Sequence, residues 1–205
     1  RQIVPGYEIV LVSEIMAPLR MIKEEVELEL MQQAGVLTGN AFEKAVARLQ
    51  AGVTELDIAT EIDYQLRTLG AEFNSFVTTV RFVGIGKDRP ATAGRATRQA
   101  LSPGDSIWFD FVCVYEGYCS DFGRSAFLGE PPPKYMIIHE TVLQAQQEAM
   151  KAMVGGKISA AQLDGIGRSV IEKASFGQYF THNLGHGIGI SVHEFPKLSP
   201  NEESI

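Results

Sequence analysis

The sequence predicts an α+β fold built from two similar halves, each with two helices followed by β-rich text. Three observations carry this prediction: amphipathic stretches at helical spacing, a strand hairpin between the halves, and a faint internal repeat. A functional site is then expected at the junction of the two halves.

The first half opens with a stretch of sequence typical of helices. Residues 18–50 carry apolar side chains at helical spacing, which predicts one long helix or two abutting ones. Thr54 precedes a shorter helix, with Asp57 three residues on and Gly70 at its far end, a pattern typical of an N-cap, a capping box and a C′ glycine. Residues 75–86 are then rich in β-branched and aromatic side chains and favour a strand.

The second half follows the same order. Residues 133–153 predict an amphipathic helix, Ser159 opens a shorter helix over residues 160–174, and residues 177–194 return to β-like text. The halves also share identities at a fixed offset of 103 residues. The matching pairs are Phe73 and Phe176, Thr78 and Thr181, Gly84 and Gly187, Ile85 and Ile188, and Gly86 and Gly189.

Between the halves lies a predicted β-hairpin whose two-residue turn is formed either by residues 115–116 or by residues 116–117. The first register sets Asp110 directly opposite Asp121, and the second sets them one diagonal step apart on the same face. Two ionised carboxylates about 4 Å apart would repel by roughly 4 kcal/mol at an effective dielectric constant near 20. A shared proton, an arginine such as Arg124 or a divalent cation would offset this repulsion. The alternative is that one acid lies at the solvent-exposed end of the hairpin and the other pairs with an arginine.

His186 and His193 stand in a glycine-rich stretch, residues 183–195. Glycine neighbours leave an imidazole uncrowded, which suits a metal ligand, although a lone histidine of this kind is also common in structural roles. The spacing of His182 and His186 also fits a helical zinc site, but the glycines disfavour a helix there. Since seven residues separate His186 from His193, both reach one site only if the strand bends or bulges.

Composition and charge exclude several classes of protein. The 205 residues are 45% hydrophobic and 21% charged, and the net charge of −7 without a basic run argues against nucleic acid or an anionic membrane as partner. No stretch approaches the roughly 20 apolar residues of a membrane helix, and no signal peptide is visible. We expect a soluble, cytoplasmic protein in which Cys113 and Cys119 are small core residues.

Residues 101–127 and 180–194 together resemble the pita-bread metallopeptidase family, which includes methionine aminopeptidase, aminopeptidase P and prolidase. Residues 18–35 resemble the start of the catalytic domain in the proline-directed branch. The resemblance implies a pita-bread fold, with two pseudo-symmetric halves around a curved antiparallel sheet, and a homodimer. It also implies that residues 1–17 are a linker or the end of a missing N-terminal domain, and that residues 18–205 are the catalytic domain without its C-terminal part.

Matched by position, the resemblance assigns roles to five side chains. Asp110 resembles the first aspartate ligand, Asp121 the aspartate that bridges two metal ions, and His186 the histidine ligand of one ion. His193 resembles the histidine that contacts the substrate and the tetrahedral intermediate, and His182 the histidine that lines the substrate pocket, so both are catalytic candidates. The implied cofactors are two divalent ions, with Mn, Co, Fe or Zn suited to such ligands, and the implied substrate is a proline-containing peptide or another small molecule.

Two departures from the family pattern bear on activity. The remaining two family ligands are glutamates that would follow Ile205, because Glu194 and Glu203 stand in a different context. We therefore expect a piece of a longer protein that by itself binds metal weakly. Ala93 stands where the family has a histidine near the leaving group, and such a group typically contributes about 10² to 10⁴ in rate. A proline-directed metallopeptidase, another hydrolase or lyase on the same fold, and a catalytically impaired binding module all remain open.

Overall fold

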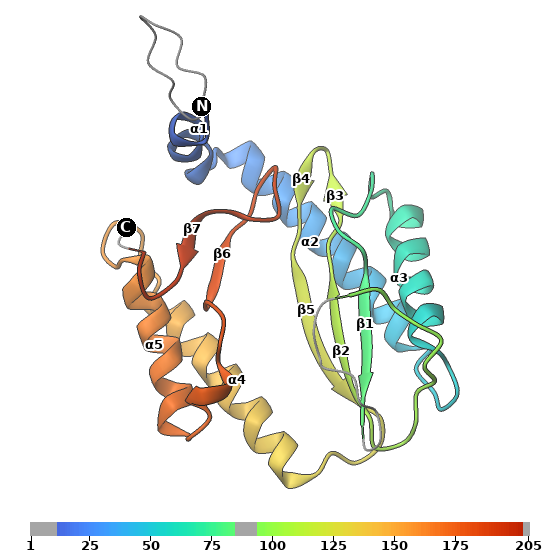
Figure 1. Ribbon diagram of the computed structural model, residues 1–205. Coiled ribbons are helices and arrows are strands. Elements are labelled where there is room, and N and C mark those ends of the chain that lie inside the picture. Colours follow the sequence, from blue (N-terminus) through green and yellow to red (C-terminus); the bar gives the residue numbers. More distant parts are fainter. Residues whose placement is uncertain (1–11, 85–93, 203–205) are drawn as a thin grey trace, which may run out of the picture.

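The computed structural model describes residues 12–84 and 94–202, and it contains the helix-helix-strand order twice (Figure 1). The first half comprises α1 (Val12–Met21), α2 (Glu25–Val46), α3 (Glu55–Leu69) and β1 (Thr79–Val83). The hairpin region comprises β2 (Ser106–Phe111), β3 (Val114–Tyr115), β4 (Tyr118–Cys119) and β5 (Phe122–Phe127). The second half comprises α4 (Pro133–Ala152), α5 (Ala160–Lys173), the 3-10 helix η1 (Gly177–Tyr179), β6 (Gly185–Gly187) and β7 (Glu194–Leu198).

The N-terminal helical stretch forms two helices, and its first boundary differs from the prediction. Helix α1 begins at Val12, before Pro18, and Pro18 lies inside it. The prediction rested on apolar side chains at helical spacing from residue 18 onward, and a proline is most favourable in the first turn of a helix rather than inside it. The helix ends at Met21, and α2 begins at Glu25 behind a capping box between Glu24 and Glu27.

The shorter helix of each half is capped as predicted. The Thr54 hydroxyl accepts from the backbone N–H of Asp57, whose carboxylate accepts from the backbone N–H of Thr54 in return. Ser159 and Gln162 form the same reciprocal pair at the start of α5. Each capping box satisfies two N–H groups that a helix start leaves without partners. Gly70 ends α3 at a φ of 110°, a left-handed conformation that suits glycine.

The strands pair only in antiparallel ladders, and the hairpin adopts the second of the two predicted registers. Tyr115 faces Tyr118 across the turn, so Glu116 and Gly117 are the turn residues, with φ values of 47° and 80°. Positive φ at both positions is the geometry of the tight turns that favour right-twisted hairpins. Asp110 faces Gly123 in the same register, which puts it one diagonal step from Asp121.

In the described part of the chain the strands form three separate ladders rather than one continuous sheet. The central sheet has the order β1-β2-β5, while β3 pairs with β4 and β6 pairs with β7. Figure 1 shows α2 and α3 packed beside the central sheet, while α4 and α5 lie on the other side of β6 and β7. The hairpin β6-β7 therefore lies between the sheet and the second pair of helices.

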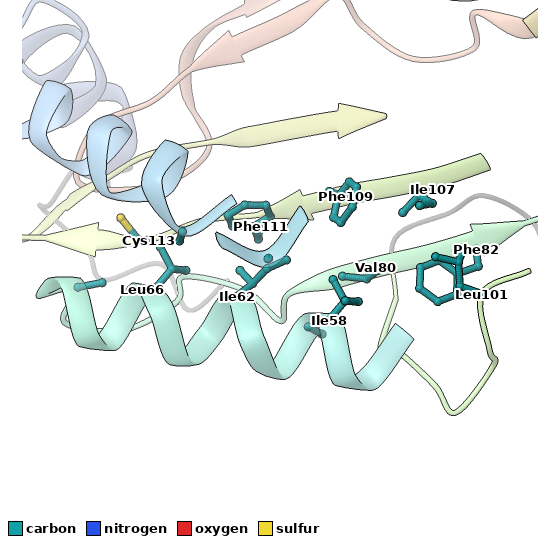
Figure 2. Packing of buried hydrophobic residues seen from close by; sticks show 14 of the residues in the cluster. Ile58, Ile62, Leu66, Val80, Phe82, Leu101, Ile107, Phe109, Phe111 and Cys113 are labelled. Carbon is teal, nitrogen blue, oxygen red and sulfur yellow. The ribbon is translucent and has the colours of Figure 1, made fainter. Parts of the chain in front are cut away.

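The largest core fills the space between α3, α2 and one face of the central sheet (Figure 2). Alternate residues of β2 point into it, so Ile107, Phe109 and Phe111 are buried while the residues between them are partly exposed. Ile58, Ile62 and Leu66 line the facing side of α3. This alternation turns Asp110 to the opposite face of the sheet, away from the core.

Cys113 and Cys119 are buried and free, as predicted. Among the described residues, no helix is long and apolar enough to cross a membrane.

Candidate active site

Two carboxylates and two imidazoles from separate parts of the chain line one cavity of about 650 Å³. Asp110 lies near the end of β2, and Asp121 lies in the gap between β4 and β5. His186 comes from β6, and His193 comes from the segment just before β7. The structure thus brings four of the five predicted side chains to one cavity at the junction of the two halves.

A buried polar cluster interrupts the hairpin beside Asp121. The Ser120 hydroxyl accepts from the backbone N–H of Cys113 at 3.0 Å and lies 2.7 Å from the hydroxyl of Thr38 on α2. Because these side chains satisfy one another away from water, the strand pair can break here without leaving polar groups unpaired. The break ends the ladder between Cys119 and Phe122 and leaves Asp121 free of it.

Both carboxylates are shifted toward the protonated form. Burial raises the pKa of Asp110, and the negative charge of Asp121 raises it further, while His193 opposes the shift. Burial likewise raises the pKa of Asp121, although His186, His193 and the backbone N–H of Phe122 lower it. The pair therefore favours a proton or a cation close to it.

The histidines meet because the chain reverses between them. His186 faces Lys197 in the β6-β7 ladder, and the register then shifts between His186 and Gly187. The bend that the glycine-rich stretch predicted is thus present, as a reversal with a bulge. The ring centroids of His186 and His193 are 4.4 Å apart. A side chain at Gly187 would meet the Phe195 carbonyl oxygen at 2.4 Å, so glycine permits this close packing of the two strands.

The hydrogen bond of His186 fixes which ring nitrogen carries a proton. Nδ1 lies 2.9 Å from the carbonyl oxygen of Gly187, and since a carbonyl only accepts, Nδ1 donates. The other nitrogen, Nε2, lies 3.3 Å from Oδ2 of Asp121. When the imidazole is neutral, Nε2 of His186 and Oδ2 of Asp121 are both acceptors. Their contact is then favourable only if a positive charge, a proton or a metal ion, lies between them. This donor set fits a divalent metal ion.

Within the described residues, the candidate ligands are not gathered into a metal cluster. Among residues 12–84 and 94–202, no three His, Cys, Asp or Glu side chains converge closely enough to hold an ion together. The guanidinium of Arg124 also takes no part in the described contacts of either carboxylate: it donates to the carbonyl of Gly123 and lies over the ring of Phe122. The interpretation in which arginine neutralises one acid therefore gains no support from this residue.

Glu194 anchors the histidine segment to the start of the chain, a contact that the sequence did not reveal. Its carboxylate accepts from Arg20, from Lys23 at 3.3 Å and from the backbone N–H of Ser191 at 2.9 Å. Burial alone would raise the pKa of Glu194, but these three donors outweigh it and hold the pKa below its ordinary value. A cavity of about 200 Å³ between α1 and this segment is lined by His193 as well. Residues from α1 and its connection to α2 thus border the candidate site.

We expect Glu194→Gln to lower the free energy of unfolding at pH 7 by roughly 1–3 kcal/mol, because it weakens charge-assisted hydrogen bonds of a side chain that is only 7% exposed. Since the folded-state pKa of Glu194 is lowered, this contribution is present above its ordinary pKa and is lost as the pH falls through the lowered value. Urea unfolding across that range measures the difference. Glu148→Gln, at a surface pair with Lys151, is the control, and an equal loss in both variants at pH 7 would refute the expectation.

Hydrogen bonds from β1 hold the part of the cavity wall that Gly94 and Arg95 form. The Thr79 hydroxyl donates to the carbonyl of Gly94 at 3.1 Å, and Arg81 donates to the carbonyl of Arg95 at 2.8 Å. Ala93, the position at which the sequence departs from the family, lies outside the described residues.

His182 lies beside this group rather than in it. It lines a second cavity of about 380 Å³ that His186 and His193 also line. Its Nδ1 donates to the carbonyl of Asn183 at 2.7 Å, which leaves Nε2 available to a ligand. His182, the fifth predicted side chain, therefore shares a neighbouring cavity with the other two histidines.

Comparisons with known proteins agree with this arrangement. The pattern of Metallopeptidase family M24 matches residues 29–205. An Xaa-Pro dipeptidase from Lactobacillus delbrueckii subsp. lactis is 36% identical over 194 residues, which cover 94% of this chain and 52% of that protein. The chain spans about half the length of the curated relatives it matches.

Solved structures show the same likeness. An X-Pro aminopeptidase from Thermotoga maritima superposes with a TM-score of 0.86 at 37% identity, covering 93% of this chain and 53% of that chain. Prolidase from Pyrococcus furiosus gives a TM-score of 0.86 at 32% identity, covering 93% of this chain and 56% of that chain. The predicted α+β pita-bread fold is confirmed. By sequence pattern and by structure, the chain belongs to metallopeptidase family M24, whose members work with divalent metal ions.

Proposed function

We propose that the full-length protein is a metal-dependent peptidase that hydrolyses the N-terminal peptide bond of proline-containing peptides, in the manner of an Xaa-Pro dipeptidase or aminopeptidase. The observation that carries the proposal is the contact between two acceptors, Nε2 of His186 and Oδ2 of Asp121, beside the second carboxylate of Asp110. The likeness to Xaa-Pro dipeptidases supports the substrate class.

In this proposal Asp110, Asp121 and His186 hold divalent metal ions. Paired ions lower the pKa of bound water and stabilise negative charge that develops on the attacked carbonyl. Carboxylates and one imidazole suit Mn, Co, Fe or Zn. Burial raises the pKa of both aspartates, and because a carboxylate binds metal in its deprotonated form, affinity for metal should fall at acidic pH.

His193 and His182 act on the substrate in this proposal. The ring of His193 lies against His186 and lines the cavity with the two aspartates, which supports a role in donating a hydrogen bond to the carbonyl oxygen under attack. His182 is placed in the adjacent cavity, where Nε2 can bind a polar group of the peptide. Both cavities open at the same pair of histidines, as a peptide spanning two subsites requires.

The wider setting is also part of the proposal. Residues 1–17 are a linker or the end of an N-terminal domain, residues 18–205 are the catalytic domain without its C-terminal part, and two glutamates that follow Ile205 complete the ligand set. We further propose that the protein is cytoplasmic and acts as a homodimer. The relatives' greater length supports a protein longer than residues 1–205.

A pair of matched dipeptides tests the substrate class. We expect the full-length protein, loaded with Mn²⁺ or Co²⁺, to hydrolyse an X-Pro dipeptide at least about tenfold faster than the X-Ala dipeptide with the same first residue. Chelation should abolish turnover, and added metal should restore it. Equal turnover of both peptides would refute the preference for proline, and turnover of neither by a metal-loaded protein would refute the peptidase.

Ala93 gives a second arm to this experiment, because it favours the alternative of a different hydrolase or an impaired binding module. If the missing imidazole limits an otherwise intact peptidase, Ala93→His should raise kcat on the X-Pro dipeptide by about 10² or more. A metal-loaded Ala93→His variant without any turnover would favour the alternative.

A further inference from the structure

A buried ion pair on α5 holds the segment that carries His182. The carboxylate of Asp164 accepts from Arg168 twice, from Nε at 2.7 Å and from Nη2 at 3.0 Å, in a two-pronged arrangement. The same carboxylate accepts from the backbone N–H of Leu184 at 2.9 Å. The Asp164 side chain is only 1% exposed, so its charge depends on these donors.

The guanidinium of Arg168 holds the other end of the segment. Nη1 donates to the carbonyl of Phe180 at 2.9 Å, and Nη2 donates to the carbonyl of His182 at 3.0 Å. The guanidinium also lies over the Phe180 ring, 4.4 Å from its centroid. The Phe180 ring in turn meets the His182 ring edge to face, with centroids 4.8 Å apart. His182 is thus fixed at its own carbonyl, at its ring and on both sides along the chain.

The first half of the molecule anchors the corresponding segment with simpler chemistry. Asp63 on α3 accepts from Nδ2 of Asn74 at 2.6 Å and from the hydroxyl of Thr78, just before β1. Asp63 and Arg168 each lie nine residues after the N-cap of their helix. Since a lone carboxylate suffices at this position in the first half, the fold does not by itself require a buried arginine pair in the second. The difference between the halves coincides with the presence of His182.

We propose that Asp164 and Arg168 are positioning residues that set the ring of His182 for substrate, and we refer to them as the α5 clamp. The role rests on the proposed function, because it assumes that His182 binds the peptide. The clamp has no described contact with the carboxylates or with His186, so losing it should weaken substrate binding while leaving the metal ligands in place. Lysine lacks the planar fork that reaches Asp164 and two carbonyls together, so Arg168→Lys should restore the clamp only in part.

Steady-state kinetics on the full-length, metal-loaded protein test this role. We expect Arg168→Met to raise KM for an X-Pro dipeptide about tenfold or more, with kcat within about threefold and bound metal unchanged. Arg168→Lys should fall between that variant and the wild type. Arg48→Met, at an arginine whose side chain is 64% exposed, is the matched control and should leave KM unchanged.

A double-mutant cycle separates positioning from general support. If Arg168 acts through His182, adding Arg168→Met to His182→Ala should raise KM no further. If the two increases in KM multiply, or if Arg168→Met lowers kcat and metal content with KM unchanged, the clamp is merely structural and the proposal fails.

Hydrogen exchange tests the clamp without any substrate. The N–H of Leu184 donates to Asp164, so Asp164→Asn and Arg168→Met should each speed its exchange at least about tenfold relative to the N–H of Phe109 in the core. Unchanged exchange at Leu184 in both variants overturns the clamp. Faster exchange at Leu184, in a protein whose wild type cleaves no X-Pro peptide, supports the clamp and refutes the proposed function instead.

Discussion

Asp121→Asn is expected to lower kcat/KM of the full-length, metal-loaded protein by about 10³-fold or more. The substitution keeps the size of the side chain but removes the negative charge that faces Nε2 of His186. Loss of a mere supporting partner of a metal ligand typically costs 10- to 100-fold, and we propose Asp121 as a ligand itself. Steady-state kinetics on an X-Pro dipeptide, with bound metal measured on the same samples, gives the effect.

The control for Asp121→Asn is Glu130→Gln, which neutralises an exposed carboxylate outside the cavity. It should leave both kcat/KM and metal content at wild-type values. If Asp121→Asn retained wild-type activity with a full complement of metal, the assignment of this aspartate would be wrong.

Glu55→Ala is expected to lower the free energy of unfolding by about 3–5 kcal/mol, the usual effect of removing one partner from a buried ion pair. The Glu55 carboxylate is 1% exposed, and it accepts from Arg81, from the backbone N–H of Phe82 and from both the N–H and the hydroxyl of Thr97. The variant leaves these donors without this acceptor in the interior. Urea unfolding with an unchanged m-value would measure the loss.

Glu148→Ala provides the comparison for Glu55→Ala, because Glu148 pairs with Lys151 at the surface, where its side chain is 42% exposed. Its removal should change stability by no more than about 1 kcal/mol. Similar losses of unfolding free energy in the two variants would show that the pair of Glu55 and Arg81 stabilises the fold no more than a surface pair does. Arg81, the partner of Glu55, also donates to the carbonyl of Arg95. Glu55→Ala is therefore expected to loosen the cavity wall at Arg95 as well.

Much of the fold could be predicted because local signals agree with the tertiary structure. The capping boxes of α3 and α5 satisfy their own helix starts, and the two-residue turn limits the hairpin to two registers, of which the structure has the one with Glu116 and Gly117 in the turn. Either register puts Asp110 and Asp121 on the same face, so their closeness could be predicted without choosing between them. The family resemblance implied that His186 and His193 share one site, and the sequence showed that this requires a bend, which the glycines permit.

The contacts that escaped prediction join residues far apart in sequence. Arg20 and Glu194 are 174 positions apart, and nothing near either residue indicates its partner. The start of α1 was misjudged because the helical spacing was followed only from Pro18 onward, whereas Pro18 lies inside the helix. Nothing in the sequence singled out Asp164, because its contact with Leu184 depends on how η1 returns the chain to α5. Long-range ion pairs of this kind depend on packing geometry, which a single sequence does not display.

Metal analysis of the full-length protein tests the central claim, that Asp110, Asp121 and His186 hold divalent ions, most directly. Protein dialysed against Mn²⁺ and freed of unbound metal is expected to retain about two ions per chain, and markedly fewer in the Asp121→Asn variant. A folded full-length protein that retains no metal, or whose metal content is the same in both forms, would contradict the claim.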